Sequence, residues 1–134
     1  MILKEDSTEQ KLRGAYYTPL KLAEKMVDFF KKDASIKSIL EPSCGDGVFV
    51  DALVETQFLT KNRKVTAIEI EKNEAQKVAE KLKNNPNVSV VNGDFFEFYQ
   101  KYKDINKYDL ILGNPRIYVI NILKKSREWK WLKY

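Results

Sequence analysis

A short glycine-bearing loop lies between an apolar run and a helical pattern, at Gly45 and Gly47. Because glycine has no Cβ, this loop can approach a bound molecule closely, and the helix that follows presents unpaired N–H groups to that molecule. The spacing is not the dinucleotide fingerprint, since Val50 stands where that motif has its third glycine. No lysine follows the glycines, which excludes a P-loop. The loop by itself is compatible with many nucleotides.

Two carboxylates narrow the ligand to a nucleoside. Glu69 closes an apolar, β-branched run, where a carboxylate can accept two hydrogen bonds from a ribose diol. Asp94 follows a further apolar run and can accept from the exocyclic amine of adenine, while Phe95 or Phe96 covers the base. Either acid alone is more often a helix cap or a solvated side chain. Together, each at the end of its own strand, they favour a nucleoside.

Strands that alternate with helices must position these residues. Such an order predicts an α/β fold, a doubly wound parallel sheet with right-handed crossovers. Ligands sit at the carboxyl ends of the strands in sheets of this kind, and the loop and both acids fall there. The predicted strands are 38–40, 64–70, 88–91 and 108–112, and the predicted helices begin at 18–19, run from the loop to about 58, cover 74–83, and start again near 95.

The first predicted helix follows the segment G-A-Y-Y-T-P, residues 14–19. Thr18 is the expected N-cap and Pro19 the expected first helical residue. Residues 1–13 are polar and are expected to be flexible. The side chains expected to form the packed face recur at helical spacing: Leu22, Met26, Phe29 and Phe30.

The composition limits the chemistry. In 134 residues Cys44 is the only cysteine and there is no histidine, which excludes an intrachain disulfide, a cysteine metal cluster and a histidine-based triad. No metal site is expected. No stretch is long and apolar enough to span a bilayer, and the first ten residues lack the order of a signal peptide. These features predict a soluble cytoplasmic protein of one domain without a membrane partner.

The net charge of +5 is confined to the C-terminal end. Through Pro115 the chain has 18 basic and 18 acidic residues, but from Arg116 onward six basic residues accompany Glu128 alone. Trp129 and Trp131 also lie in that segment. A break of this kind predicts a boundary between residues 14–115 and a basic tail of residues 116–134. The tail is either a nucleic-acid arm or a segment of foreign origin.

Five motifs occur in a fixed order: G-x-Y-Y-T-P, L-E-P-S-C-G-D-G-x-F, an acid after the second strand, G-D-F, and Y-D-L-I-L-G-N-P. In this order the chain resembles the S-adenosylmethionine-dependent DNA adenine N6-methyltransferases of restriction-modification type, in the class whose Tyr-Thr-Pro motif precedes the glycine loop. The resemblance implies S-adenosylmethionine as cofactor, double-stranded DNA as partner, and a partial Rossmann-like methyltransferase fold truncated after its fourth strand. It implies cofactor contacts from Tyr17, Thr18 and Pro19 at the methionine end, from Glu41, Cys44 and Gly45 in the loop, from Glu69 at the ribose, and from Asp94 and Phe95 at the adenine.

By the same resemblance, Asn114 and Pro115 open the catalytic motif Asn-Pro-Pro-Tyr. The Asn side-chain oxygen and the proline carbonyl accept the two N–H bonds of the target amino group, which localises electron density on nitrogen without a formal base. The target adenine is flipped out of the duplex and stacks on the motif's aromatic ring. Here Asn114-Pro115 is followed by Arg116-Ile117-Tyr118, so the second proline and the aromatic residue in register are missing.

A single-base frameshift would explain this departure. One codon set for residues 115–121, with one cytosine inserted, encodes Pro-Pro-Tyr-Ile-Arg-Tyr-Gln and restores the family motif. On this hypothesis residues 116–134 are non-native, the truncated enzyme is inactive, DNA reading is mostly lost, and the fourth strand is an exposed edge open to association. Two alternatives stay open: a non-catalytic cofactor-binding fragment or subunit, and a methyltransferase for RNA bases or protein glutamine.

Overall fold

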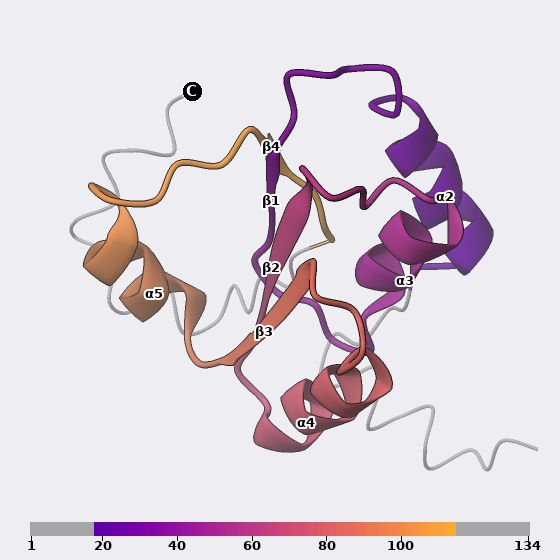
Figure 1. Cartoon of the computed structure of the whole chain (residues 1–134). Coiled ribbons are helices and arrows are strands. Elements are labelled where there is room, and N and C mark those ends of the chain that lie inside the picture. The colour runs from indigo at the N-terminus through magenta and orange to yellow at the C-terminus, as the bar shows by residue number, and fades with distance from the viewer. Residues whose placement is uncertain (1–17, 115–134) are drawn as a thin grey trace, which may run out of the picture. The chain divides into compact units, whose positions relative to one another are not determined.

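The computed structural model describes residues 18–114 (Figure 1). Within these residues, four parallel strands form one sheet in the order β3-β2-β1-β4. The helices α2 (Leu20–Asp28), α3 (Val48–Glu55) and α4 (Lys72–Lys81) lie on one side of the sheet, and α5 (Phe95–Tyr102) lies on the other (Figure 1). The predicted doubly wound parallel α/β fold is confirmed. The strands are β1 (Ser38–Glu41), β2 (Lys64–Glu69), β3 (Val88–Asn92) and β4 (Leu110–Ile111).

The strand order reverses next to β1. From β1 the chain proceeds outward to β2 and β3, and then returns to place β4 on the other side of β1. In open parallel sheets, ligands bind outside the carboxyl ends of the strands at such a switch point. The crevice is thus expected between the ends of β1 and β4, where Glu41 and Asn114 lie.

Strand β4, which pairs with β1, covers only Leu110–Ile111, whereas the sequence predicts a strand over residues 108–112. Before the ladder, the Asp109 N–H donates to the Ser38 carbonyl at 2.9 Å. The Asp109 Oδ2 accepts from the backbone N–H groups of Lys37 (2.8 Å) and Ser38 (2.9 Å) and from the Ser38 hydroxyl (3.0 Å). Beyond the two ladder residues, the Leu112 N–H donates to the Leu40 carbonyl at 2.9 Å. The pairing therefore extends to the point where the chain leaves toward Asn114.

The predicted start of α2 (Leu20–Asp28) is wrong by one residue. The prediction of which side chains of this helix are packed is also wrong. Pro19 occupies the N-cap with φ −60° and ψ 136°, and no side chain caps the helix. Ala23 and Val27 are fully buried, whereas Phe29 is 86% exposed and follows the helix end. The reason is close packing of α2 on α3, which selects small side chains at the contact. Leu22 and Phe30 are exposed as well, and only Met26 of the expected set packs partly against the core.

The remaining helices follow the predicted alternation: α3 (Val48–Glu55), α4 (Lys72–Lys81) and α5 (Phe95–Tyr102). The apolar positions of α3 are buried as the sequence predicts, and the helix ends three residues earlier than expected. No helix within residues 18–114 is long and apolar enough to cross a membrane. The buried core includes Ala23, Val27, Ile39, Phe49, Val50, Ala52, Leu53, Phe58, Val65, Ala67, Val78 and Leu112.

At the amino ends of the strands, Arg63 pins the loop that precedes β1. This side chain is 8% exposed. Its guanidinium donates to the carbonyls of Asp33 at 2.7 Å and Ile36 at 3.2 Å, and to the Lys31 carbonyl at 3.3 Å. It also stacks over the Phe58 ring at 4.2 Å from the centroid. The buried guanidinium is stabilised because its N–H groups donate hydrogen bonds to these backbone carbonyls.

Candidate functional site

Parallel strands bring polar residues from distant parts of the sequence to one edge of the sheet. Glu41 ends β1, Glu69 ends β2, and Asp94 follows β3. The glycine loop (residues 44–47) joins β1 to α3, and Asn114 follows β4. The sequence places all of these residues at carboxyl ends of strands, and the structure has them there.

The backbone of the glycine loop adopts a conformation that residues with a Cβ rarely adopt. Gly45 and Gly47 have φ values of 54° and 85°, in the left-handed region that favours glycine. A Cβ on Gly47 would also lie 3.1 Å from Val78 of α4. The Cys44 N–H donates to the Ile68 carbonyl at 2.8 Å, so β2 supports the loop as well. The loop is therefore a preformed turn held between β2 and α4.

Cys44 is a buried, neutral side chain of this loop. It is 5% exposed, and burial raises the pKa of its thiol to about 12, with Glu69 and Glu41 adding to the effect. A thiol of this kind is not a nucleophile at neutral pH. Cys44 thus serves as a small loop residue.

Glu69 organises the glycine loop from the end of β2. Its Oε2 accepts from the Gly45 N–H at 2.7 Å and its Oε1 from the Glu71 N–H at 2.9 Å, and the side chain is 7% exposed. The sequence predicts only a contact with a ribose diol at this position. Each carboxylate oxygen has a second lone pair that can accept from a ligand hydroxyl. The ribose contact stays a prediction, and the bond to the loop is a role that sequence reasoning missed.

Glu41 carries the most unusual carboxyl of the site. It is 1% exposed, and its Oε1 accepts only a long bond from the Ser43 N–H at 3.3 Å. Its Oε2 has no hydrogen-bond partner within residues 18–114, and neither does the Ser43 hydroxyl. Burial raises the pKa of Glu41 to about 8, and the charge of Glu69 adds to that effect. A buried acceptor without a partner has a cost, so such a group commonly awaits a bound molecule.

The Glu41 carboxyl lies directly against the backbone that leads to Asn114. A Cβ built on Gly113 would stand 2.3 Å from Glu41 Oε1, so a larger residue there would displace the Glu41 carboxyl. Asn114 is exposed, and its Nδ2 donates to Thr18 Oγ1 at 3.4 Å. This contact brings Thr18 beside Asn114, 96 positions away in sequence. Thr18, Glu41 and Asn114 thus meet at the switch point.

Asp94 and Phe95 have clear structural roles. Asp94 caps α5, and its Oδ1 accepts from the N–H groups of Phe96 at 2.7 Å and Glu97 at 3.2 Å. Phe95 is half-buried, with its ring centroid 5.5 Å from that of Phe96 and 6.3 Å from that of Tyr99. The capping bonds use one carboxylate oxygen and leave Oδ2 for another donor. Their contacts with an adenine stay predictions.

Two expected site residues are outside the part of the chain that the structure describes, and one residue that was not expected bonds the turn beside the site. Tyr17 and Pro115 lie outside the described residues. Pro19 is at the start of α2, exposed. Asn92 was not foreseen: its amide donates to the carbonyls of Glu69 at 2.9 Å and Ile70 at 3.0 Å and so shapes the turn after β2. Its place in the dipeptide Asn-Gly beside an acid was the available signal.

Chemically, the site offers carboxylates, an amide and backbone groups. Within residues 18–114, no group of three or more His, Cys, Asp or Glu residues is arranged to hold a metal ion. The buried Glu41 carboxyl suits a cationic group, and Glu69 and Asp94 suit hydroxyl and amine donors. The Asn114 amide suits a substrate N–H. The arrangement can therefore bind a nucleoside-like molecule with a cationic end beside an amide acceptor.

Comparison with known proteins matches most of this chain to part of larger enzymes. The type II methyltransferase M.NspV of Nostoc sp. is 34% identical over 106 residues, which is 75% of this chain and 22% of that protein. M.HincII of Haemophilus influenzae is 30% identical over 82% of this chain and 18% of that protein. Modification methylase CviBIII of Paramecium bursaria Chlorella virus NC1A is 31% identical over 85% and 28%. The chain thus spans less than a third of the length of these curated relatives. No protein-family model matches it.

Solved structures give the same fold. An O-methyltransferase from Bacillus cereus in complex with SAH superposes with a TM-score of 0.63 at 17% identity, over 85% of this chain and 56% of that chain. The 23S rRNA methyltransferase ErmE superposes with a TM-score of 0.55 at 20% identity, over 81% and 41%. At these identities the likeness concerns the fold: a Rossmann-like sheet with flanking helices.

Proposed function

We propose that the chain is a member of the type II DNA methyltransferases of restriction-modification systems and forms the cofactor-binding part of an adenine-N6-specific enzyme. The observation that carries the proposal is the buried Glu41 carboxyl, unpaired at Oε2, beside Gly113 and Asn114. It places an acceptor for a cation next to an amide that can receive substrate N–H bonds. The order of motifs along the chain supports adenine as the target base.

S-adenosylmethionine is the cofactor of this family, and the residues of the site fit it. Its methionine end carries an ammonium that would relieve the unpaired Glu41 oxygen, with Tyr17, Thr18 and Pro19 near that end. Its ribose would meet Glu69, and its adenine Asp94 and Phe95. The glycine loop supplies close backbone approach where a side chain would intrude. When bound, the cofactor supplies an electrophilic methyl group.

The role of the chain's own residues in transfer is to orient a nitrogen. Asn114 Nδ2 is turned toward Thr18 Oγ1, which leaves Asn114 Oδ1 to accept from the target amino group. The carbonyl of Pro115 accepts the second N–H bond. Two such bonds fix the amino group and raise the electron density on its nitrogen, so that no side chain needs to remove a proton first.

We propose further that residues 116–134 are a non-native tail and that this chain is inactive in methyl transfer. The support is the charge and tryptophan break at Arg116, together with the missing second proline and aromatic residue. Without that ring, a flipped base has nothing to stack on in the motif. Sequencing the DNA around codon 115 tests the tail: codons that cannot give Pro-Pro and an aromatic residue in the shifted frame contradict it. A cofactor-binding fragment without catalysis is the form that the missing residues favour.

The function is tested on the full 134-residue chain with labelled S-adenosylmethionine. Cofactor binding is measured by calorimetry, and methyl transfer is measured on mixed-sequence duplex DNA, with analysis for N6-methyladenine. We expect saturable binding without transfer. Transfer to adenine would contradict the inactivity and support the base specificity, while transfer to cytosine would contradict the specificity. Absence of binding would contradict the proposed cofactor site.

A further inference from the structure

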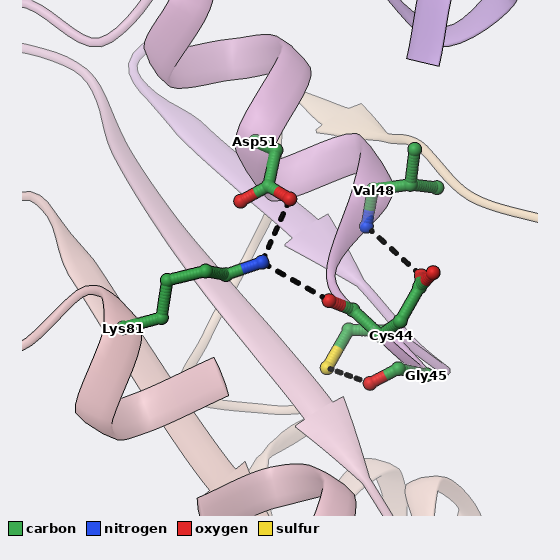
Figure 2. A network of polar contacts seen from close by, with 6 residues as sticks. Cys44, Gly45, Val48, Asp51 and Lys81 are labelled. Atoms are coloured by element: carbon green, nitrogen blue, oxygen red, sulfur yellow. Dashed lines mark hydrogen bonds and ion pairs between the residues drawn. The ribbon is translucent and has the colours of Figure 1, made fainter. Parts of the chain in front are cut away.

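Lys81, the last residue of α4, reaches across to the glycine loop. Its Nζ lies 2.7 Å from Asp51 Oδ2 and 3.2 Å from the carbonyl oxygen of Asp46 (Figure 2). Asp46 stands between the two glycines, and Asp51 is the acidic residue in the first turn of α3. One ammonium therefore joins α4, the loop and the start of α3.

Two side chains from outside the loop contact its backbone. Glu69 accepts from the Gly45 N–H at 2.7 Å. Lys81 donates to the Asp46 carbonyl at 3.2 Å, two peptides further along. Gly47 packs against the same helix, since a Cβ there would lie 3.1 Å from Val78 and 3.6 Å from Lys81 Nζ. The peptides of both glycines are thus fixed by contacts from outside the loop.

Lys81 lies between the ends of two helices whose dipoles have opposite effects on a cation. It suits the end of α4, because a cation there meets the negative end of the helix dipole. It also lies beside the N-terminal turn of α3, where a cation is unfavourable. Asp51 offsets that repulsion. The arrangement thus holds an ammonium at the loop carbonyl where an isolated helix start would repel it.

We propose that Lys81 is a positioning residue of the cofactor loop: it holds the Asp46 peptide so that the left-handed turn of residues 45–47 is formed before the cofactor binds. This proposal rests on the proposed function of the loop. Lys81 acts through the loop backbone. Its ion pair with Asp51 is partly exposed, with side-chain exposures of 44% and 31%, and pairs of this kind add little to global stability. Loss of Lys81 should therefore loosen the loop and leave global unfolding nearly unchanged.

The test uses three variants of the full chain. Lys81→Met removes the ammonium and keeps the length of the side chain, and Lys81→Arg restores a donor. Lys83→Met is the matched control, because Lys83 forms an exposed pair with Glu80 at 2.5 Å near the same helix end. Two quantities are measured: the amide hydrogen exchange of residues 45–48 without ligand, and the Kd for S-adenosylmethionine. Urea unfolding reports global stability.

We expect Lys81→Met to speed exchange at residues 45–48 and to raise the Kd about threefold to tenfold, a range typical of one partly exposed charged contact. Lys81→Arg should recover most of both changes, and Lys83→Met should show neither. Unchanged loop exchange in Lys81→Met overturns the proposal. So does faster exchange across the whole domain with a matching loss of global stability, since that result describes a structural residue only. If the unaltered chain binds no cofactor, the proposed function fails, and the loop exchange still decides the role of Lys81.

Discussion

The amino ends and the carboxyl ends of the strands, here called the two edges of the sheet, differ in how their polar groups find hydrogen-bond partners. At the amino ends of the strands, Arg63 donates to three carbonyls, and Asp109 accepts from Lys37 and Ser38. At the carboxyl ends, Glu41 is almost fully buried, and its Oε2 has no hydrogen-bond partner among residues 18–114. Glu69, beside it, accepts two backbone N–H bonds, so the incomplete group at this end of the strands is Glu41. The first edge serves stability, and the second is suited to binding.

The comparison is clearest between two carboxyls. Hydrogen bonds from the Lys37 and Ser38 N–H groups and the Ser38 hydroxyl hold the pKa of Asp109 below its usual range. Burial raises the pKa of Glu41 to about 8. Glu41 is buried and Asp109 is exposed, so burial is the main cause of the difference in pKa, and the donors around Asp109 add to it. Burial and the supply of donors, more than residue type, thus separate the structural acid from the site acid.

The largest effect is expected at the structural edge. Arg63→Met removes donors from three carbonyls and the contact with the Phe58 ring, and should lower the free energy of unfolding by about 2–4 kcal/mol. Urea unfolding measures this loss, with Arg63→Lys as a control that keeps a charge and loses the fork of donors. The cofactor Kd of the folded variant should not change. A loss below about 1 kcal/mol would contradict the assignment of this edge to stability.

A smaller effect, on binding, is expected at the other edge. Glu69→Ala removes the acceptor of the Gly45 N–H and the expected ribose contact, and should weaken S-adenosylmethionine binding by about 1.5–3 kcal/mol. Asp94→Ala should weaken it over a similar range, with an added loss of stability from the missing helix cap. Calorimetric titration of each variant gives the affinities. If neither differs from the unaltered chain, the two acids do not hold the cofactor.

The pH dependence of stability should reveal Glu41. Its folded pKa of about 8 exceeds the ordinary 4.5, so its folded form holds a proton that the unfolded form releases. The contribution of Glu41 to the free energy of unfolding is therefore greatest below about pH 4.5 and is lost as the pH rises toward 8. Glu41→Gln should remove this slope and stabilise the cofactor-free chain by about 1 kcal/mol at pH 8. Unfolding curves at pH 5 and pH 8 compare the two proteins, and an identical slope in both would show that Glu41 is not the titrating group.

The smallest effect concerns the face of α2. Leu22 is 51% exposed, so Leu22→Ala should change the free energy of unfolding by less than about 0.5 kcal/mol. Val27→Ala, on the fully buried face, should cost about 1–2 kcal/mol. Thermal unfolding of the pair ranks them. A larger loss of stability in Leu22→Ala than in Val27→Ala would show that the packed face of α2 is the one that the sequence predicts.

The fold was predictable because its signals are local. Apolar, β-branched runs such as that of β2 alternate with helical patterns, and that order leaves few topologies. The packed face of α2 was not predictable, because close contact with α3 favours Ala23 and Val27 over larger apolar residues. Only the packing of two helices shows which side chains are small enough.

The site was partly predictable for the same reason. Strand ends mark Glu69 and Asp94 as polar residues at one edge. The bond from Gly45 to Glu69 spans 24 positions, and that from Lys81 to Asp51 spans 30, so neither leaves a pattern in sequence. The missing partner of Glu41 Oε2 is likewise a property of the folded environment. Sequence gives the residue types at the site, and packing decides which of them are satisfied.

In the proposed site, the carboxyl ends of the strands bind S-adenosylmethionine, and Glu41 receives its ammonium. The direct measurement is calorimetric titration of the full chain at pH 7 in two buffers with different ionisation enthalpies, for the unaltered chain and for Glu41→Gln. We expect saturable binding with release of a proton, since Glu41 is protonated below a pKa of about 8 and ionises beside a cation. Glu41→Gln should bind more weakly and release no proton. No saturable binding, or equal proton release by both proteins, would contradict the account.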